Sequence, residues 1–471
     1  MLKKIVIPIL LFCLFYSKAQ ATHLMGGEIT WQCQGNGSYI FTVKLYRDCN
    51  GSIGEDSITV YVFNNPALDS IRLGVVTRND ISPNCNPSGP VISCKAAEDS
   101  KTPIAGAVQE AIFKSAPINL SGVPPPNGWV FTYDECCRNQ SISNISVASQ
   151  YGFTLRAIMF PFNGKNAGPC FDSSPTFLES PSSIICLGYP FTYNHNASDA
   201  DLDSLSYSWD TPFSDFSGNY DPPNNPFPLK YTNGYSYKSP LPGPAQDSRN
   251  VPATINAATG EISFTSYTQG YFVTVVKVEA WKCNQKVAEI YREMQIVLLP
   301  CSVNEQPTVT FTSYKDTVEA GELVNFTIHG NDPGVLADGV TPQSLTITAT
   351  GTQLGTSATT GCLNPPCATL NPTAPVKGTT DVTTTFNWQT TCDHIAQASG
   401  CNPHPNTYTF VFKTQDDFCP APAQNISTVS ITVLATKIVP SPQPRCVAVQ
   451  PNGDVTLTWS AVSNAAGTFN S

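Results

Sequence analysis

Short runs of alternating apolar and polar residues recur along most of the 471-residue chain, and this pattern constrains its fold more than any other feature. In SYIFTVKLY, Phe41, Val43 and Leu45 share one face of an extended strand, because successive side chains on a strand point to opposite sides. The same period of two recurs in SITVYVF, VVKVEAW, YTFVFK and VSITV, whereas helical spacing is nearly absent. Gly, Pro, Asn and Asp separate these runs, as in QGNG at 34–37, a strong hairpin signal. The sequence therefore predicts an all-β protein of tandem Ig-like β-sandwich domains.

The first 21 residues have the features of an export signal. Lys3 and Lys4 precede an apolar run from Ile5 to Tyr16, and AQA at 19–21 is a small-x-small cleavage site. The run is shorter than the roughly 20 apolar residues that a membrane-spanning helix needs, although a retained anchor is the alternative. We therefore expect a secreted or cell-surface protein that begins at Thr22 and has no transmembrane segment.

Composition narrows the class of partner. Charged residues make up 13% of the chain and the formal net charge is −10, without a basic stripe. A nucleic-acid-binding surface needs clustered Lys and Arg, so we expect no nucleic-acid partner.

Cysteine usage fits an oxidising compartment. Of 17 cysteines only Cys13 lies in the leader, which leaves an even sixteen, and disulfides are the default expectation in an exported chain. We expect the β-domains to be cross-linked through Cys33, Cys49, Cys85, Cys94, Cys136, Cys137, Cys170, Cys186, Cys283, Cys301, Cys362, Cys367, Cys392, Cys401, Cys419 and Cys446.

The adjacent pair Cys136 and Cys137 ends the predicted strand in WVFTYDECCRNQ. Neighbours on a strand point to opposite faces, so one shared tetrahedral metal would distort the backbone, and a bond between them would close a strained ring. Two separate disulfides fit this geometry, and we predict Cys33 and Cys49 as the partners; a metal or redox pair is the alternative.

Two further pairings follow from spacing. Cys85 and Cys94 bracket a loop rich in Pro, Asn, Gly and Ser, which predicts a local disulfide. The third segment holds an odd five cysteines before the linker, and Cys446 is the candidate that makes the number even.

Two stretches resemble metal sites. CDHIAQASGCNPH contains Cys392, His394, Cys401 and His404, a zinc-like set, but in an exported chain a Cys392–Cys401 disulfide with two solvated histidines is the favoured interpretation.

NASDADLDSLSY is the better metal candidate. Asp199, Asp201 and Asp203 alternate there and could converge on calcium, although three acids fall short of the usual six to eight oxygen ligands. A solvated acidic turn is the alternative, and Asp332 and Asp338 form a weaker counterpart later in the chain. The only cofactor hypothesis is therefore calcium.

No catalytic residue is predicted. The chain contains no nucleophile elbow, HExxH motif or phosphate-binding Gly-rich loop. Paired carboxylates for glycoside hydrolysis stay open, because such pairs come from distant strands.

Composition shifts place the domain boundaries. After the signal peptide (1–21) we expect a disulfide-rich β-sandwich module at 22–180, an Ig-like or cadherin-like domain at 181–302 and a PKD- or Ig-like domain at 303–438. The proline-rich stretch KIVPSPQPRC then leads to 443–471, which is similar to the first two strands of a fibronectin type III domain, with Trp459 as its core tryptophan. Such a domain needs roughly 90–100 residues, so we expect this one to be truncated.

Three motifs carry a family resemblance: HLMGGEI and YRDC within 22–51, and CCRN within 135–145. They resemble the amino-terminal module of large surface proteins of gliding bacteria, which commonly end in a gliding-motility-associated or type IX secretion sorting domain. The second segment resembles a bacterial Ig-like or cadherin-like repeat through SDADLDSLSY and INAATGEISFTSYTQGYFVTVVKVEA. Where calcium-binding relatives continue with acids, this chain has Trp281, Lys282 and Cys283.

The resemblance implies a non-catalytic secreted or cell-surface adhesin or stalk, associated with gliding motility or surface adhesion. Surface glycans or proteins are then the expected partners. The alternatives are an ancillary binding or spacer region of a large secreted polysaccharide-degrading enzyme, and a purely structural spacer.

Overall fold

The computed structural model describes residues 24–52, 54–83, 85, 92–100, 102–135, 138–162, 172–181, 184–214, 229–301, 304–395, 405–419, 422–435 and 444–459. Within these ranges the chain is almost entirely β-structure, which confirms the predicted class. The α-helix of the described part is the short α2 (Cys94–Asp99), and two single 3₁₀ turns occupy Ala148–Gln150 and Cys392–His394. None of these described helices has the length and apolarity needed to cross a bilayer.

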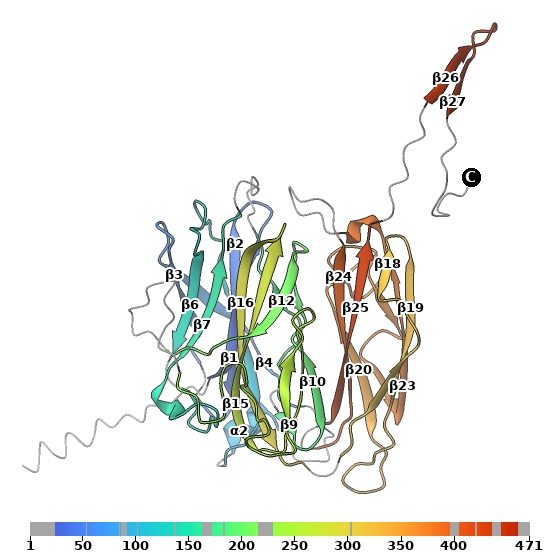
Figure 1. Ribbon diagram of the computed structural model, residues 1–471. Coiled ribbons are helices and arrows are strands. Elements are labelled where there is room, and N and C mark those ends of the chain that lie inside the picture. Colours follow the sequence, from blue (N-terminus) through green and yellow to red (C-terminus); the bar gives the residue numbers. More distant parts are fainter. Residues whose placement is uncertain are drawn as a thin grey trace, which may run out of the picture.

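Described residues between 24 and 301 form a first unit around one eleven-stranded sheet. Its main path runs β1-β2-β5-β4-β3-β6-β7-β16-β15-β12, and β1 also pairs with β16, so the pairings close a circuit around one core (Figure 1). The strands of this sheet are β1 (Leu24–Cys33), β2 (Tyr39–Asp48), β3 (Ser57–Phe63), β4 (Ser70–Asp80), β5 (Val108–Ser115), β6 (Trp129–Glu135), β7 (Phe153–Met159), β9 (Ile184–Cys186), β12 (Ser204–Trp209), β15 (Gly270–Lys282) and β16 (Gln285–Leu299).

Smaller sheets complete the first unit. One has the order β10-β14-β13 and the other pairs β8 with β11. Their bounds are β8 (Thr176–Phe177), β10 (Pro190–Asn194), β11 (Ala197–Ser198), β13 (Val251–Ile255) and β14 (Glu261–Thr265).

Strand β16 is the most enclosed element of this unit. Every residue from Val287 to Leu298 is buried, so both of its faces are covered. It pairs with β15 along nearly its whole length and also, in succession, with β7, β1 and β9. The register places Ile290 beside Ala157 of β7 and Met294 beside Gly26 of β1.

The domain boundary predicted near Ser180 is therefore wrong as a division between two independent sandwiches. Strands β15 and β16 lie beyond this boundary, yet they belong to the same sheet as β1–β7. The physical reason is that β16 supplies hydrogen-bonding partners to β7 and β1, which leaves no surface at which 22–180 and 181–302 could separate.

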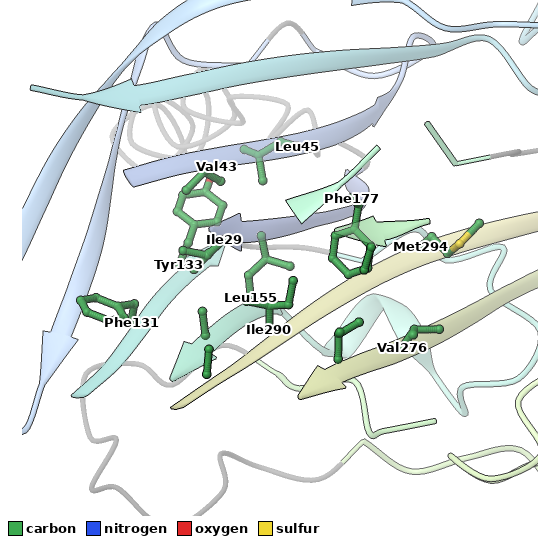
Figure 2. Packing of buried hydrophobic residues seen from close by; sticks show 14 of the residues in the cluster. Ile29, Val43, Leu45, Phe131, Tyr133, Leu155, Phe177, Val276, Ile290 and Met294 are labelled. Atoms are coloured by element: carbon green, nitrogen blue, oxygen red, sulfur yellow. The ribbon is translucent and has the colours of Figure 1, made fainter. Parts of the chain in front are cut away.

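The core of the first unit draws on both predicted segments. Figure 2 shows Ile29 and Leu155 close to Ile290 of β16, and Val43 and Phe131 belong to the same buried cluster. Ile29, Val43, Phe131 and Ile290 are fully enclosed, with no exposed surface. The alternation predicted for β2 is confirmed, because Phe41, Val43 and Leu45 all lie in this core.

Described residues between 304 and 435 form a second unit, in which two sheets enclose a separate core. The boundary predicted near Cys301 falls between the two units. One sheet has the order β17-β19-β23-β21 and the other β18-β25-β24-β20-β22. The strands are β17 (Thr308–Phe311), β18 (Thr317–Glu319), β19 (Leu323–Asn331), β20 (Ser344–Thr350), β21 (Thr369–Asn371), β22 (Val376–Thr379), β23 (Asp381–Gln389), β24 (Asn406–Gln415) and β25 (Gln424–Leu434).

Aromatic rings fill the space between these two sheets. The ring centroids of Phe326 and Phe386 stack 4.7 Å apart on one sheet, and Phe386 meets Phe410 of the other edge-on at 4.9 Å. Farther along the chain, β26 (Pro444–Val449) and β27 (Val455–Trp459) form a hairpin where a fibronectin type III start was predicted.

The disulfides differ from the predicted local pairs. Cys49 bonds to Cys94 and Cys85 bonds to Cys419, so the predictions of a Cys85–Cys94 loop and of a bond from Cys49 to the adjacent cysteine pair are wrong. Spacing in the sequence misled here because Cys94 opens α2, which lies against the end of β2 and brings its sulfur to Cys49.

Two more disulfides join described cysteines, Cys186–Cys301 and Cys362–Cys367. Cys33 and Cys283 are disulfide-bonded as well. The predicted disulfide cysteines Cys136, Cys137, Cys170 and Cys401 lie outside the described residues. For Cys446, only the backbone is described.

The glycine pair of HLMGGEI allows β1 to approach its neighbours closely. A Cβ on Gly26 would lie 2.1 Å from the carbonyl oxygen of Glu293 on β16, and one on Gly27 would lie 2.6 Å from that of Lys44 on β2. Both distances are far inside van der Waals contact with backbone atoms that cannot move without breaking strand pairing.

We therefore predict that Gly26→Ala lowers the free energy of unfolding by about 3 kcal/mol or more, since the added methyl overpacks a backbone contact. Gly74→Ala on β4 is the matched control, because its new Cβ would meet nothing within 4 Å. Chemical denaturation of the two variants measures the difference, and equal stability would contradict this account of the glycine pair.

Candidate functional site

The acidic residues predicted from NASDADLDSLSY gather at one end of the first unit. Asp199 directly follows β11 and Asp203 directly precedes β12. The Oδ1 atom of Asp199 accepts hydrogen bonds from the backbone amides of Asp201 at 2.8 Å and Asp203 at 3.2 Å. These bonds fold the loop so that Asp199 and Asp203 point inward, whereas Asp201 is exposed.

Two residues that the sequence analysis did not single out complete this cluster. Asp172, which precedes β8, is buried, and its Oδ1 atom lies 3.0 Å from the Nζ atom of Lys282 at the end of β15. The same Nζ atom lies 3.4 Å from Oδ2 of Asp203. We call Asp172, Asp199, Asp201, Asp203 and Lys282 the acidic cluster.

Burial dominates the electrostatics of the acidic cluster. Burial, and then the carboxylates of Asp203 and Asp201, raise the pKa of Asp199 well above its ordinary value. Burial opposes the charged form of Lys282, but Asp172 and Asp203 outweigh it and raise the pKa of this ammonium group. The Oδ2 atoms of Asp172 and Asp199 are buried without a hydrogen-bond partner.

Lys282 therefore supplies a cation inside the cluster. Among the described residues, no three Asp, Glu, His or Cys side chains converge as a metal-binding group. A calcium ion at Asp199, Asp201 and Asp203 would have to compete with an ammonium group already paired to two carboxylates. Calcium at this cluster stays a prediction from the sequence.

The acidic cluster borders the surface along which the two units contact each other, which we call the seam. A cleft of about 350 Å³ is lined on one side by residues such as Asp199, Asp203 and Tyr207, and on the other by residues such as Asn406 and Tyr408.

Direct hydrogen bonds cross this seam. Asn196 Nδ2 donates to Thr350 Oγ1 at 3.0 Å, and Thr352 Oγ1 donates to Ser198 Oγ at 2.9 Å. The Thr350 hydroxyl also donates to the carboxylate of Glu179. The two units are therefore joined by polar contacts as well as by the Cys85–Cys419 disulfide.

The zinc-like stretch is organised differently from both of its predicted forms. Cys392 carries a free, exposed thiol, against the predicted Cys392–Cys401 disulfide. His394 is fully buried rather than solvated.

Hydrogen bonds and ring packing hold His394 in place. Its Nδ1 atom accepts from the amide of Thr391 at 2.9 Å, and its Nε2 atom lies 2.9 Å from the carbonyl oxygen of Asn364. Trp388 and Tyr408 pack around the ring. Because both ring nitrogens are already engaged, His394 is not available as a metal ligand; His404 lies outside the described residues.

Two buried ion pairs connect the sequence motifs to β16. Glu28 of HLMGGEI pairs with Arg292, whose Nη2 atom lies 3.0 Å from Oε1 of Glu28. Arg138 of CCRN pairs with Glu293, with Nη2 to Oε2 at 3.1 Å. All four side chains are at most 4% exposed. Although burial alone would raise it, Arg292 and Lys44 hold the pKa of Glu28 below its ordinary value.

The sequence analysis missed these pairs. One partner of each, Arg292 or Glu293, lies in the YREMQ stretch of β16, and two charged residues there do not indicate an enclosed strand. A signal was present, however: two adjacent opposite charges require partners when the strand that carries them is enclosed.

Comparisons with known proteins add little. Neither a protein-family model nor a curated protein sequence matches the chain. Among solved structures, native E. coli alpha-2-macroglobulin aligns with 88% of this chain and 29% of its own length, at 9% identity and a TM-score of 0.18.

The S-layer protein rSbsC aligns with 88% of this chain and 56% of its own length, at 11% identity and a TM-score of 0.14. E. coli alpha-2-macroglobulin activated by porcine elastase aligns with 88% of this chain and 41% of its own length, at 9% identity and a TM-score of 0.18. The chain thus spans well under two thirds of each of these structures, and likenesses at these TM-scores carry no argument about its fold or function.

The acidic cluster makes a pH-dependent prediction. Because the folded-state pKa of Asp199 is raised, its stabilising contribution is fully present below the unfolded pKa, about 3.9, and is lost as pH rises through the folded pKa. Asp199→Asn keeps an oxygen for the two loop amides but removes the charge. We predict that this variant is more stable than the wild type at pH 8 by about 1–3 kcal/mol, and that the difference disappears near pH 4.

Denaturant unfolding at both pH values, in the presence of a chelator, measures this difference. Asp201→Asn is the matched control in the same loop, because its side chain is exposed and it removes only one of the charges that raise the pKa of Asp199, so a smaller gain at pH 8 is expected. A destabilised Asp199→Asn variant at pH 8 would contradict the account. A calcium-dependent rise in the wild-type Tm that this variant loses would instead establish the calcium site predicted from sequence.

Proposed function

We propose that the chain is a non-catalytic, exported adhesin or stalk segment whose two units act as one force-resisting block at a cell surface. The observation that carries this proposal is the Cys85–Cys419 disulfide, which links the first unit to the second across 334 residues of sequence.

This disulfide changes how tension passes through the chain. When the two ends are pulled apart, force reaches Cys85 from one side and Cys419 from the other. The covalent bond then carries it, so the residues between them cannot be extended while the bond is intact. The elements from α2 to β24, including β16, are shielded in this way.

The seam supports the same role. Hydrogen bonds that join Asn194, Asn196 and Ser198 to threonines of the second unit resist hinge motion between the units, which a spacer of freely jointed domains would allow. Val411 and Ile426 of the second unit also belong to the apolar cluster of the first. Disulfides of this kind persist in an oxidising, extracellular compartment, which agrees with the export signal predicted from the sequence.

The sequence motifs suggest the biological setting. HLMGGEI, YRDC and CCRN resemble modules of surface proteins in gliding bacteria, and a stiff support is what such a protein needs to present a binding surface for glycans or proteins. Gliding motility, surface adhesion and type IX secretion are part of this proposal on the strength of that resemblance alone.

Single-molecule force spectroscopy tests the proposal on the complete oxidised chain held between marker domains. We predict that the double variant Cys85→Ser/Cys419→Ser gains several tens of nanometres of extensible contour length over the wild type, and that full reduction of the wild type adds roughly 110 nm or more. The matched control Cys362→Ser/Cys367→Ser opens a bond that spans 5 residues inside the segment closed by Cys85–Cys419, so it should gain no extensible length over the wild type.

A wild-type chain that extends as far when oxidised as when reduced would overturn the proposed role. Chemical reduction provides the second measurement if the double variant is secreted poorly.

A further inference from the structure

A second set of buried oxygens lies at the junction of the two units, away from the acidic cluster. Asn304 belongs to the linker between β16 and β17, Asp332 directly follows β19, Gln343 directly precedes β20 and Asp416 directly follows β24. Four separate segments thus bring these side chains to one end of the second unit. Asp332 is 2% exposed and Gln343 is 1% exposed.

The hydrogen bonds of this set fix the orientation of both amides. A carboxylate only accepts, so Asn304 turns its NH₂ group toward Asp416, with Nδ2 to Oδ2 at 2.7 Å. The oxygen of Asn304 then faces Gln343, whose Nε2 atom donates to it at 2.8 Å and to the carbonyl oxygen of Val335 at 3.1 Å. Turning Gln343 over would set its oxygen against two other acceptors.

This orientation leaves two buried acceptors without donors. Oε1 of Gln343 and Oδ2 of Asp332 are both buried and have no hydrogen-bond partner. The two head groups pack against the same residue, because a Cβ on Gly334 would lie 2.8 Å from Oδ1 of Asp332 and 2.9 Å from Nε2 of Gln343. Two buried acceptors on head groups that flank the same glycine therefore lack a positive or donating partner among the described residues.

The surrounding charges are also negative. The charged groups that act on Asp332 are the carboxylates of Glu305 and Asp417, and Asp332 in turn acts on Asp416. Among the described residues, no Lys, Arg or His lies within ion-pair distance of Asp332 or Asp416. In the acidic cluster of the first unit, Lys282 supplies a positive charge to the carboxylates. Asn304, Asp332, Gln343 and Asp416, which we call the junction set, have no such cation in the described part of the chain.

We propose that the junction set binds a calcium ion through the oxygens of Asp332, Gln343 and Asp416, with neighbouring carbonyl or carboxylate oxygens completing its shell. Calcium accepts carboxylate and amide oxygens in flexible numbers, whereas magnesium demands near-ideal octahedral geometry and zinc prefers nitrogen and sulfur. The few carboxylates available place the expected Kd at roughly 0.1–1 mM, the range of extracellular calcium modules.

A cation at this position would fasten the linker to the second unit, since Asn304 is bonded directly to Asp416. The site stands on its own geometry and does not depend on the proposed adhesin or stalk role. If calcium does not bind there, the force-bearing role proposed for the Cys85–Cys419 disulfide is unaffected.

The test uses the complete secreted chain. Calcium titration by calorimetry should give saturable binding of roughly 0.1–1 mM Kd, and 5 mM CaCl₂ should raise the Tm by about 2–4 °C over a chelator control. The isosteric variant Asp332→Asn should lose both effects. In chelator it should melt at or above the wild-type temperature, because the substitution removes a buried negative charge whose charged neighbours are the carboxylates of Glu305 and Asp417.

Two variants serve as controls. Asp338→Asn lies in the same loop, but Asp338 is exposed and accepts from the amides of Val340 and Thr341, so calcium binding should persist. Asp199→Asn should also retain the calcium-dependent Tm rise, which separates the junction set from the acidic cluster.

Absence of binding heat and of any Tm shift up to 10 mM calcium would overturn the proposal and leave an ordered water as the partner of the two acceptors. A calcium-dependent shift that survives Asp332→Asn unchanged would overturn it as well.

Discussion

Two oppositely charged residues in the middle of an enclosed strand hold the first unit together. Arg292 and Glu293 are adjacent on β16, and each needs a partner because an isolated charge in such a position costs several kcal/mol. Glu28 on β1 neutralises the first and Arg138 neutralises the second. Removing one member of a buried pair of this kind typically costs about 3–5 kcal/mol, so these contacts fix the position of β16 rather than merely adding to its stability.

The consequences reach the second unit through a short chain of contacts. Nη1 of Arg292 donates to the carbonyl oxygen of Glu179 at 2.7 Å, and the carboxylate of Glu179 accepts from Thr350 across the seam. The Cys85–Cys419 disulfide then closes the same pair of units covalently. The ion pairs of Arg292 and Glu293 thus hold β16 within the first unit. Polar contacts at the seam and one long-range disulfide then hold the first unit to the second.

Local patterns predicted the local structure well. Alternation identified β2, β3, β15, β24 and β25, because each has one apolar face and turn residues at its ends. It did not identify β16, whose two faces are both buried and whose central residues are charged, so neither a period of two nor a continuous apolar run describes it. Because β16 was not identified, the sequence predicted a domain boundary near Ser180. The pairing of β16 with β1 and β7 across this boundary shows that the prediction is wrong.

Long-range partners lay beyond what the sequence could specify. Nothing in the spacing of Cys85 indicates Cys419, because sequence separation does not encode which chain segments meet. Asp199, Asp201 and Asp203 were recognisable as a group, but Asp172 and Lys282 reach them from distant parts of the chain. His394 looked solvated among polar neighbours, yet Trp388 and Tyr408 enclose it.

The most direct measurement compares residues 22–180 with residues 22–301, both secreted under oxidising conditions and both carrying Cys85→Ser. Near-ultraviolet circular dichroism and thermal melting report whether each piece has a packed core. The account predicts a cooperative melt for 22–301 and none for 22–180, because the shorter piece lacks Arg292, Glu293 and the whole of β16. A cooperative melt of 22–180 alone would contradict it.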